Sequence, residues 1–358
     1  MFRFVFCLIL IALFSYPVQG LERPDKEFKI FQFPPDMIPC IDGKTDDWAI
    51  VPDEYAIGND ELKDTVKNTP NDKKDLDVTV KIGWVKGMDK LYFLYEAYDD
   101  YWEFDKPGSM NDIFELVVDA DLSGGALIPS LRGDKVLNES DGYFRFQGIH
   151  AQNYHINTPA AGKSWAMVWG CQPWIAHLPW ANAAYKYNFK QGESGKLVLE
   201  FWITPFDYAP YEGPGQAIIS KLEENRLIGM SWAILDQDGH PGGNDGFYNL
   251  SHKTTMYGNA SDLVAFRLMP LEKRFHKTLE PNFTFTVIDM DRKLIAFKDL
   301  SYGNITKWLW DFGDGASSAE QNPIHQYQKP GYYYVVNLTV EGPEGKARMS
   351  IPWDVAIK

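Results

Sequence analysis

The sequence predicts an all-β protein that contains a large antiparallel β-sandwich followed by a small immunoglobulin-like β-sandwich. Segments of alternating apolar and polar residues recur along the chain, and this alternation is the period of a pleated strand. Clusters of Gly, Pro, Asn and Asp separate these segments and are typical of turns. Aromatic residues make up 15% of the 358 residues, and large rings favour sheets. One stretch, residues 215–225, has a weak helical pattern.

The strands of the large sandwich follow from this alternation. The run from Leu91 to Tyr98 pairs with the strand before it as a hairpin. The next apolar run, from Ile113 to Val118, contains one acidic residue, Glu115. A carboxylate in such a run needs a partner or a ligand, because its burial alone is costly. The other strands predicted in this part are residues 78–84, 143–148, 197–203, 227–235 and 263–268.

The start of the chain predicts export. Arg3 precedes an apolar run from Phe4 to Phe14, and Gly20 ends a segment suited to cleavage. We therefore expect residues 1–20 to be a secretory signal, and the protein to be extracellular, cell-surface or periplasmic. No other run of the sequence has the length and apolarity of a membrane span, so we expect none.

The net charge is −14, which argues against a nucleic-acid partner because phosphate backbones attract basic surfaces. Once residues 1–20 are removed, the cysteines that remain are Cys40 and Cys171. In an oxidising compartment they either form one disulfide or stay as two buried thiols, and their spacing does not decide between these alternatives.

The C-terminal part contains a dense motif. Its elements are WDFGDG at 310–315, Asn322-Pro323, Pro330-Gly331 and the strand VVNLTV at 335–340. The Trp and Phe of the motif are expected to fill a small sandwich, while its glycines allow a tight turn with positive φ. The pattern resembles a PKD domain over residues 277–358. The resemblance implies a spacer or a contact module for other extracellular proteins, and no catalyst.

A longer and more diffuse pattern covers residues 28–270. Its parts are IDGKTDDW at 41–48, NDIFELVVDAD at 111–121, EFWITP at 200–205 and WAILDQD at 232–238. In this order they resemble the family 9 carbohydrate-binding modules and the related DOMON-like sandwiches. The resemblance implies two antiparallel sheets, bound calcium and a sugar held between two aromatic rings.

The same resemblance implies a ligand site. Glu115 takes the place of a carboxylate that accepts hydrogen bonds from sugar hydroxyls. A ring is expected near Ser109, so we assign its role to Trp102 in the same loop, and Tyr248 stands for the second ring; packing beneath a loop is the alternative for both. Flat rings cover sugar C–H faces, while carboxylate, amide and imidazole groups bind hydroxyls. The predicted ligand-binding residues are Trp102, Glu115, Gln152, Asn153, His155 and Tyr248.

Two acidic pairs follow predicted strands, Asp119 with Asp121 and Asp236 with Asp238. Calcium takes roughly six to eight oxygen ligands, and such pairs contribute to calcium sites. A solvated turn is the simpler interpretation of either pair alone, whereas the family resemblance favours a structural calcium.

The segment from 150 to 187 is rich in aromatic residues. It holds Trp165, Trp169, Trp174 and Trp180, which we expect to build a local core rather than a binding platform. The segment also carries the residues of an enzyme alternative. A polysaccharide lyase would draw its base from His150, Tyr154, His155 or His177 near Lys163, and a glycoside hydrolase would pair Glu115 with Glu200.

We therefore predict a secreted carbohydrate-binding protein that recognises a polysaccharide or its end without catalysis, in extracellular polysaccharide capture or degradation. Two alternatives stay open: an enzyme that acts on such a polysaccharide, and a cell-surface adhesion or scaffold protein without a sugar site.

Overall fold

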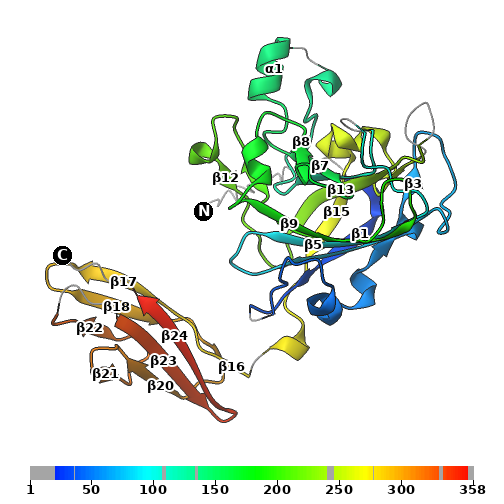
Figure 1. The fold of residues 1–358 in the computed structure, drawn as a ribbon. Helices are drawn as coiled ribbons and strands as arrows, with labels where there is room; N and C mark the ends of the chain where they lie inside the picture. The colour runs from blue at the N-terminus through cyan, green and yellow to red at the C-terminus, as the bar shows by residue number, and fades with distance from the viewer. Residues whose placement is uncertain are drawn as a thin grey trace, which may run out of the picture. The chain divides into compact units, whose positions relative to one another are not determined.

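The computed structural model describes residues 21–35, 37–106, 110–133, 136–239, 246–276, 278–329 and 334–353. The expected signal segment, residues 1–20, lies outside the described residues. Contacts divide the chain into two units, Met1–Leu271 and Glu272–Lys358. The described part of both units consists of strands, 3₁₀ turns and a single short α-helix (Figure 1), which confirms the predicted all-β class.

One curled sheet of 13 strands forms the larger unit. From one edge to the other its path is β8 (Ala166–Val168), β7 (Gln152–Asn157), β6 (Ile113–Asp119), β13 (Leu227–Asp236), β15 (Val264–Leu268), β1 (Glu22–Gln32), β4 (Leu76–Trp84), β5 (Leu91–Asp99), β10 (Gly195–Ile203) and β9 (Ala181–Lys186). The short strands β2 (Ile57–Gly58), β3 (Lys63–Asp64) and β14 (Gly246–Asn249) pair off this path, and β11 (Phe206–Tyr208) pairs with β12 (Ile218–Ile219).

The strand β1 joins the two layers of this sheet. Residues 27–30 pair with β15 in one layer, and Phe31 and Gln32 pair with β4 in the other. Both pairings are parallel, whereas the other strand pairs of the described chain are antiparallel. The predicted antiparallel sandwich is therefore confirmed, with β1 as the strand that carries the chain from one layer to the next.

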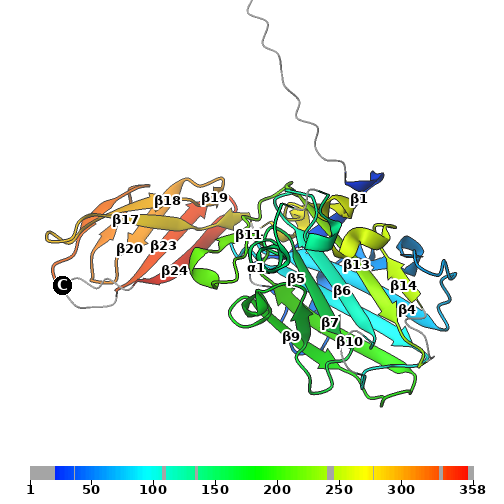
Figure 2. The same cartoon turned by 90° about the horizontal axis from the view of Figure 1, so that it is seen from above.

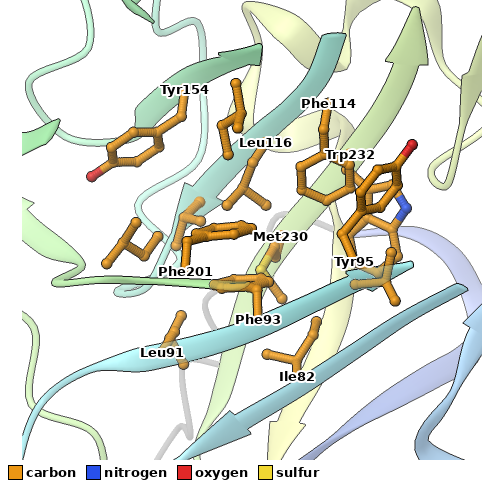
Figure 3. Close-up of a cluster of buried hydrophobic side chains, with 14 of the residues drawn as sticks. Ile82, Leu91, Phe93, Tyr95, Phe114, Leu116, Tyr154, Phe201, Met230 and Trp232 are labelled. Atoms are coloured by element: carbon orange, nitrogen blue, oxygen red, sulfur yellow. The ribbon is translucent and has the colours of Figure 1, made fainter. Parts of the chain in front are cut away.

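Aromatic side chains fill the space between the layers (Figure 3). Phe93 and Phe201 stack with ring centroids 4.5 Å apart, and Phe114 of the opposite layer lies 4.9 Å from Tyr95. In the turned view the strands of the two layers overlap (Figure 2), and the ring centroids of Phe114 on β6 and Phe201 on β10 lie 6.1 Å apart. Stacked and tilted ring pairs add to the stability that burial of their area provides. The core therefore uses the alternating inward positions that the sequence predicts.

The outer face of β6 and β13 is also covered. Ile113 and Val117, which point away from the main core, form a second core with Leu127, Met256 and other buried residues of the loops that cover the sheet. Because side chains alternate along a strand, Glu115 lies between these two apolar residues on the same covered face.

Two local predictions are wrong. Residues 143–148 do not form a strand; the helix α1 (Glu139–Arg145) occupies this region, and Asn138 caps it by accepting a hydrogen bond from the Asp141 amide. This cap and the acidic first turn favour a helix over a strand. Residues 215–225 are not a helix but contain β12 and turns. The 3₁₀ turns are Asp46–Ile50, Asp53–Tyr55, Asn59–Glu61, Pro129–Leu131, Pro173–Ala176, Pro214–Gln216, Thr254–Tyr257, Ala260–Asp262 and Lys273–Phe275.

The smaller unit is the predicted small sandwich. Its sheets are β17 (Phe283–Asp289), β18 (Leu294–Asp299) and β22 (Ile324–Gln326); β21 (Ser317–Ser318), β20 (Lys307–Asp311), β23 (Tyr334–Gly342) and β24 (Gly345–Trp353); and β16 (Leu279–Glu280) with β19 (Tyr302–Gly303). Trp310 and Phe312 are buried in its core. Gly313 and Gly315 have φ values of 81° and 92°, so the glycines occupy the left-handed region as predicted.

Across the described residues, no helix has the length and apolarity needed to cross a membrane.

Candidate functional site

A buried polar cluster lies on the outer face of β6 and β7. Glu115 of β6 pairs directly with His155 of β7, so their side chains project from the same face, and Asn153 lies two residues along β7 on that face. Asn153 Nδ2 donates to Glu115 Oε1 at 2.7 Å, and His155 Nε2 lies 3.0 Å from the same oxygen. All three side chains are buried. The sheet register therefore brings together three of the predicted ligand-binding residues.

Two aromatic residues border this cluster. The Trp169 ring centroid is 5.2 Å from His155 and 5.3 Å from Tyr257. Backbone contacts hold both residues in place, because Asn153 Nδ2 donates to the Tyr257 carbonyl at 2.7 Å and the Trp169 amide donates to the Asn153 carbonyl at 2.9 Å. Both aromatic residues are half-buried. The site thus combines partly exposed rings with a carboxylate, an amide and an imidazole.

Three polar atoms of the cluster have unused hydrogen-bonding capacity. Asn153 Oδ1 and both ring nitrogens of His155 are buried and have no hydrogen-bond partner within the described part of the chain, although His155 Nε2 lies 3.0 Å from Glu115 Oε1. A buried group without a partner costs about 1–3 kcal/mol, and most such groups in proteins are satisfied by protein, water or ligand. These atoms therefore mark a place where an external polar group can bind.

Trp102 and Tyr248 do not serve as stacking rings in this arrangement, and this part of the prediction is corrected. Trp102 is 1% exposed, its ring stacks on Phe189 at 4.9 Å, and its Nε1 donates to the Gly195 carbonyl. Tyr248 is buried in the main core, because it pairs with the inward-facing Ile234. A ring without an exposed face offers nothing for a sugar to stack on, so the alternative of packing beneath a loop describes both.

Gln152 also lies away from the cluster. It precedes Asn153 on β7 and therefore projects from the opposite face. Its Nε2 donates to the Phe206 carbonyl at 3.0 Å, and its Oε1 accepts from the Phe206 amide at 3.1 Å. Gln152 thus anchors β11 to the sheet and has no free group for a ligand.

The residues of the two enzyme alternatives are not brought together. Glu200 projects from the outer face of β10, whereas Glu115 projects from the outer face of the opposite layer, so the core separates the two carboxylates. Tyr154 points into the main core while its neighbour His155 points out. His150 binds the Asp207 carbonyl through Nδ1. Of the residues predicted for the lyase and the hydrolase, the structure brings His155 and Glu115 into contact.

A second cluster contains three buried carboxylates. Oxygens of Asp99, Asp112 and Asp236 lie within 4.8 Å of one another. The three residues stand at the end of β5, just before β6 and at the end of β13, all on the inward side of the sandwich. Burial and then the neighbouring carboxylates raise the pKa of Asp99 to about 7, and the same causes hold the pKa of Asp112 well above its usual range.

This acidic cluster has the donor atoms of a calcium site. The hydroxyl of Tyr95 is buried without a hydrogen-bond partner among the described residues, and burial followed by the charges of the three carboxylates raises the pKa of this phenol. A second group, Asp75, Asp100 and Asp238, also gathers carboxylate oxygens within 4.8 Å. Calcium prefers such oxygen ligands, and the residues present fit it.

The predicted metal residues thus separate. Asp236 and Asp238 belong to the two acidic groups, with partners that the sequence analysis did not assign to a metal site. Asp119 instead caps a turn, because its carboxylate accepts from the Ser123 amide at 3.2 Å and the Gly124 amide at 2.8 Å. Asp121 also accepts from the Ser123 amide. Neither belongs to an acidic group of three within the described chain, so this pair serves to hold a turn, with Asp119 buried and Asp121 exposed.

The sequence analysis missed Trp169 and Tyr257 as site residues. Trp169 was assigned to a local core with three other tryptophans, and those three do pack against the main core. Trp169 differs because it packs on the outer face. Tyr257 lies in a 3₁₀ turn 104 residues from Asn153, and no local pattern links the two. The alternation of β7 was the one available signal, since it places position 155 and its cross-strand neighbours outside.

Comparison with known proteins adds a family for the C-terminal part. Residues 292–357 match the family model described as PKD domain. The C-terminal part is similar to a PKD domain. Collagenase ColQ1 of Bacillus cereus (strain Q1) is 48% identical over 48 residues, which cover 13% of this chain and 5% of that protein. Collagenase ColA of Clostridium perfringens (strain 13 / Type A) is 32% identical over 109 residues, which cover 27% of this chain and 10% of that protein.

Solved structures similar to this chain include a family 9 carbohydrate-binding module from Caldicellulosiruptor kristjanssonii in complex with cellotriose. The TM-score is 0.45 and the sequence identity is 14%, and the match covers 70% of this chain and 98% of that one. Another is the PKD1 domain of Vibrio anguillarum Epp, with a TM-score of 0.21, 24% identity and coverage of 23% of this chain and 98% of that one. The expected resemblance to a family 9 module followed by a PKD domain is confirmed. The chain spans 5% and 10% of the two collagenases.

Proposed function

We propose that the larger unit binds a carbohydrate on the outer face of β6 and β7. The site consists of Glu115, Asn153, His155, Trp169 and Tyr257. The observation that carries the proposal is the pair of buried polar atoms, Asn153 Oδ1 and His155 Nδ1, that have no hydrogen-bond partner among the described residues. Their position beside two half-buried rings supports a ligand that has both hydroxyl groups and apolar faces.

Each component matches a feature of a sugar. Asn153 Oδ1 is an acceptor for a hydroxyl hydrogen, and His155 Nδ1 bonds a second hydroxyl. The rings of Trp169 and Tyr257 cover C–H faces. Because both unsatisfied atoms are buried, binding requires a movement of the surrounding side chains that exposes them. The ligand class itself follows the sequence resemblance to family 9 modules.

The setting of this binding is also a proposal. We infer that the chain is exported and acts in polysaccharide capture or degradation outside the cytoplasm, where the larger unit holds the glycan. The smaller, PKD-like unit then acts as a spacer or as a contact for other extracellular proteins. Its sandwich core and glycine turns give it a stable body for this role.

We further propose that the two acidic groups bind structural calcium. Three carboxylates are costly to bury in their charged form, and a divalent cation would offset that cost. Asp99, Asp112 and Asp236 would hold the ion directly. The ion would then tie the end of β5 to β6 and β13 and stabilise this end of the sandwich.

An enzyme is the second candidate function. His155 Nε2 lies 3.0 Å from Glu115 Oε1, and an imidazole oriented by a carboxylate is suited to act as a general base. The proposal of binding without catalysis is favoured because Glu200 projects from the opposite layer and Tyr154 points into the main core.

Affinity gel electrophoresis tests the binding proposal. The full protein is run in gels that contain hydroxyethylcellulose, xylan, laminarin or alginate, and retardation by at least one glycan is expected. Trp169→Ala and Tyr257→Ala should lose the retardation. The matched control is Tyr302→Ala, which removes an exposed ring of the smaller unit and should leave retardation unchanged. Retention of binding by both site variants would show that the site is elsewhere.

The same glycans separate binding from catalysis. Reducing ends and the absorbance of unsaturated products are followed during long incubation with the wild-type protein. No increase over a protein-free sample is expected. An increase that disappears in His155→Ala would instead establish the enzyme alternative.

A further inference from the structure

A group of exposed aromatic rings stands on α1 and on the loop after β11. Tyr143, Phe144 and Tyr211 are 41%, 46% and 44% exposed. Their rings contact one another, with centroids 5.1 Å apart for Tyr143 and Phe144 and 5.6 Å apart for Phe144 and Tyr211. Contiguous exposed apolar groups mark interaction sites more often than single exposed residues do. The proposed carbohydrate site does not include these rings.

The exposed rings are continuous with the proposed site. Tyr143 Oη donates to the Gly170 carbonyl at 3.4 Å, and Gln147 Nε2 donates to the Trp169 carbonyl at 3.4 Å. Both bonds attach the α1 region to the segment that carries the Trp169 ring. The helix α1 projects from the body of the larger unit (Figure 1). The exposed rings of α1 therefore adjoin the segment that carries Trp169.

The chemistry around these rings favours a glycan over an apolar protein surface. The two ring pairs meet edge to face, at 86° and 65°, and are not stacked in parallel. On α1, Asp141 and Arg145 form an ion pair at 3.5 Å with side chains that are 44% and 72% exposed. Docking of an apolar protein surface would desolvate these charges, which is costly. Hydroxyl groups of a sugar would instead bond with them.

We propose that Tyr143, Phe144 and Tyr211 extend the carbohydrate site, so that the larger unit binds several successive sugar units along a polysaccharide chain and not only a chain end. The proposal rests on the proposed function, since the extension begins at the Trp169 and Tyr257 site. It adds a ligand class: oligosaccharides long enough to reach from the buried polar cluster to α1.

Dependence of affinity on ligand length tests this proposal. Isothermal titration calorimetry compares two-unit and six-unit ligands for the full protein: cellobiose with cellohexaose, xylobiose with xylohexaose and laminaribiose with laminarihexaose. For the glycan that binds, we expect the six-unit ligand to bind on the order of tenfold more tightly. The double variant Phe144→Ala/Tyr211→Ala should bind both lengths with the two-unit affinity.

Two further variants make the result specific. Phe144→Tyr keeps a ring and should retain the wild-type preference for the longer ligand. Tyr302→Ala should also leave this preference unchanged. Because both mutated rings are exposed, circular dichroism should show an unaltered fold. Equal wild-type affinity for both lengths, or a preference that survives in the double variant, would overturn the extension and leave the proposed site intact. Failure of every ligand to bind would overturn the proposed function together with the extension.

Discussion

Glu115 and Glu200 occupy equivalent places on the two layers of the larger unit, and their surroundings differ. Each stands near the middle of a strand, projects from an outer face and is buried. Glu200 accepts hydrogen bonds from the amides of residues 42, 43 and 44 at 3.1, 2.6 and 3.1 Å and from Trp48 Nε1 at 2.8 Å. Glu115 contacts only two described side chains, Asn153 and His155.

The number of satisfied hydrogen bonds distinguishes a carboxylate that stabilises the fold from a carboxylate that can bind a ligand. Four donors satisfy Glu200, and they come from a backbone turn that it holds in place. The neighbours of Glu115 retain unused hydrogen-bonding atoms. A buried carboxylate whose hydrogen-bonding positions are all used stabilises the fold. A carboxylate whose neighbours keep unused hydrogen-bonding atoms is available for a ligand. The following variants break or sharpen this contrast.

The largest effect is expected from Glu200→Ala. It leaves the amide of Gly43 and the indole N–H of Trp48 without their acceptor, and loss of hydrogen bonds to a buried charge costs about 3 kcal/mol or more. Urea unfolding followed by tryptophan fluorescence measures the loss. Glu115→Ala is the matched comparison and should lose less. An equal loss in both variants would end the distinction between a structural and a binding carboxylate.

The second-largest effect on stability is expected at the calcium site proposed for Asp99, Asp112 and Asp236. If it holds calcium, addition of calcium at about 100 times its dissociation constant stabilises the unit by about 2.7 kcal/mol, and a chelator removes this gain. Differential scanning calorimetry with and without calcium measures it. Asp112→Asn should lower the response to the part that the Asp75, Asp100 and Asp238 group contributes, whereas Asp121→Asn, which alters a turn outside both groups, should keep it in full. An unchanged melting temperature in the wild type would contradict the site.

A smaller effect on free energy, but a specific one, is expected from Glu115→Gln. The variant keeps the shape of the side chain and removes its charge, so the free energy of unfolding should change by less than about 1 kcal/mol. Glycan affinity should fall on the order of tenfold, because hydrogen bonds to a charged acceptor are stronger than those to a neutral one. Calorimetric titration and urea unfolding of the same sample separate the two quantities. Loss of stability without loss of affinity would reverse the assignment.

The smallest effect is expected at the exposed carboxylate Glu27. Arg267 binds it through two nitrogens at 2.6 Å, and this hydrogen bonding holds the pKa of Glu27 below its usual range. The contribution to stability is present above the unfolded pKa and is lost as the pH falls through the lower folded pKa. Because the pair is exposed to screening, Glu27→Gln should cost at most about 0.5 kcal/mol at neutral pH. Urea unfolding at pH 7 and at pH 3 should show that cost only at pH 7, and a cost that persists at pH 3 would contradict this account.

The strand alternation made much of the fold predictable. Glu115, Trp102 and Trp169 show which properties of the site it predicted and which it did not. It placed Glu115 in a covered strand that needed a partner, and the register with His155 supplies one. It did not distinguish Trp102 from Trp169, because both are tryptophans in aromatic-rich segments. Phe189 covers the first ring, whereas the second lies at a partly open position on the outer face. Exposure of a ring depends on residues far away in the chain, which composition does not reveal.

The acidic residues make the same point. Asp236 was predicted from its place at a strand end, but Asp99 and Asp112 meet it only because β13 pairs with β6 and β5 lies in the facing layer. Asp119 has the same local context as Asp236, and its carboxylate instead binds the amides of its own turn. Local context therefore predicts acidic strand ends but not which of them converge.

The sequence by itself determined the all-β class, the motif of the smaller unit and the presence of a carboxylate on a covered strand, since these depend on alternation, turn residues and spacing within short segments. The tertiary structure alone decided which rings stay open to solvent and which carboxylates come together. These properties are set by pairing between strands and by loops that fold over a face, and such contacts join residues about a hundred positions apart, as Asn153 and Tyr257 do with a separation of 104.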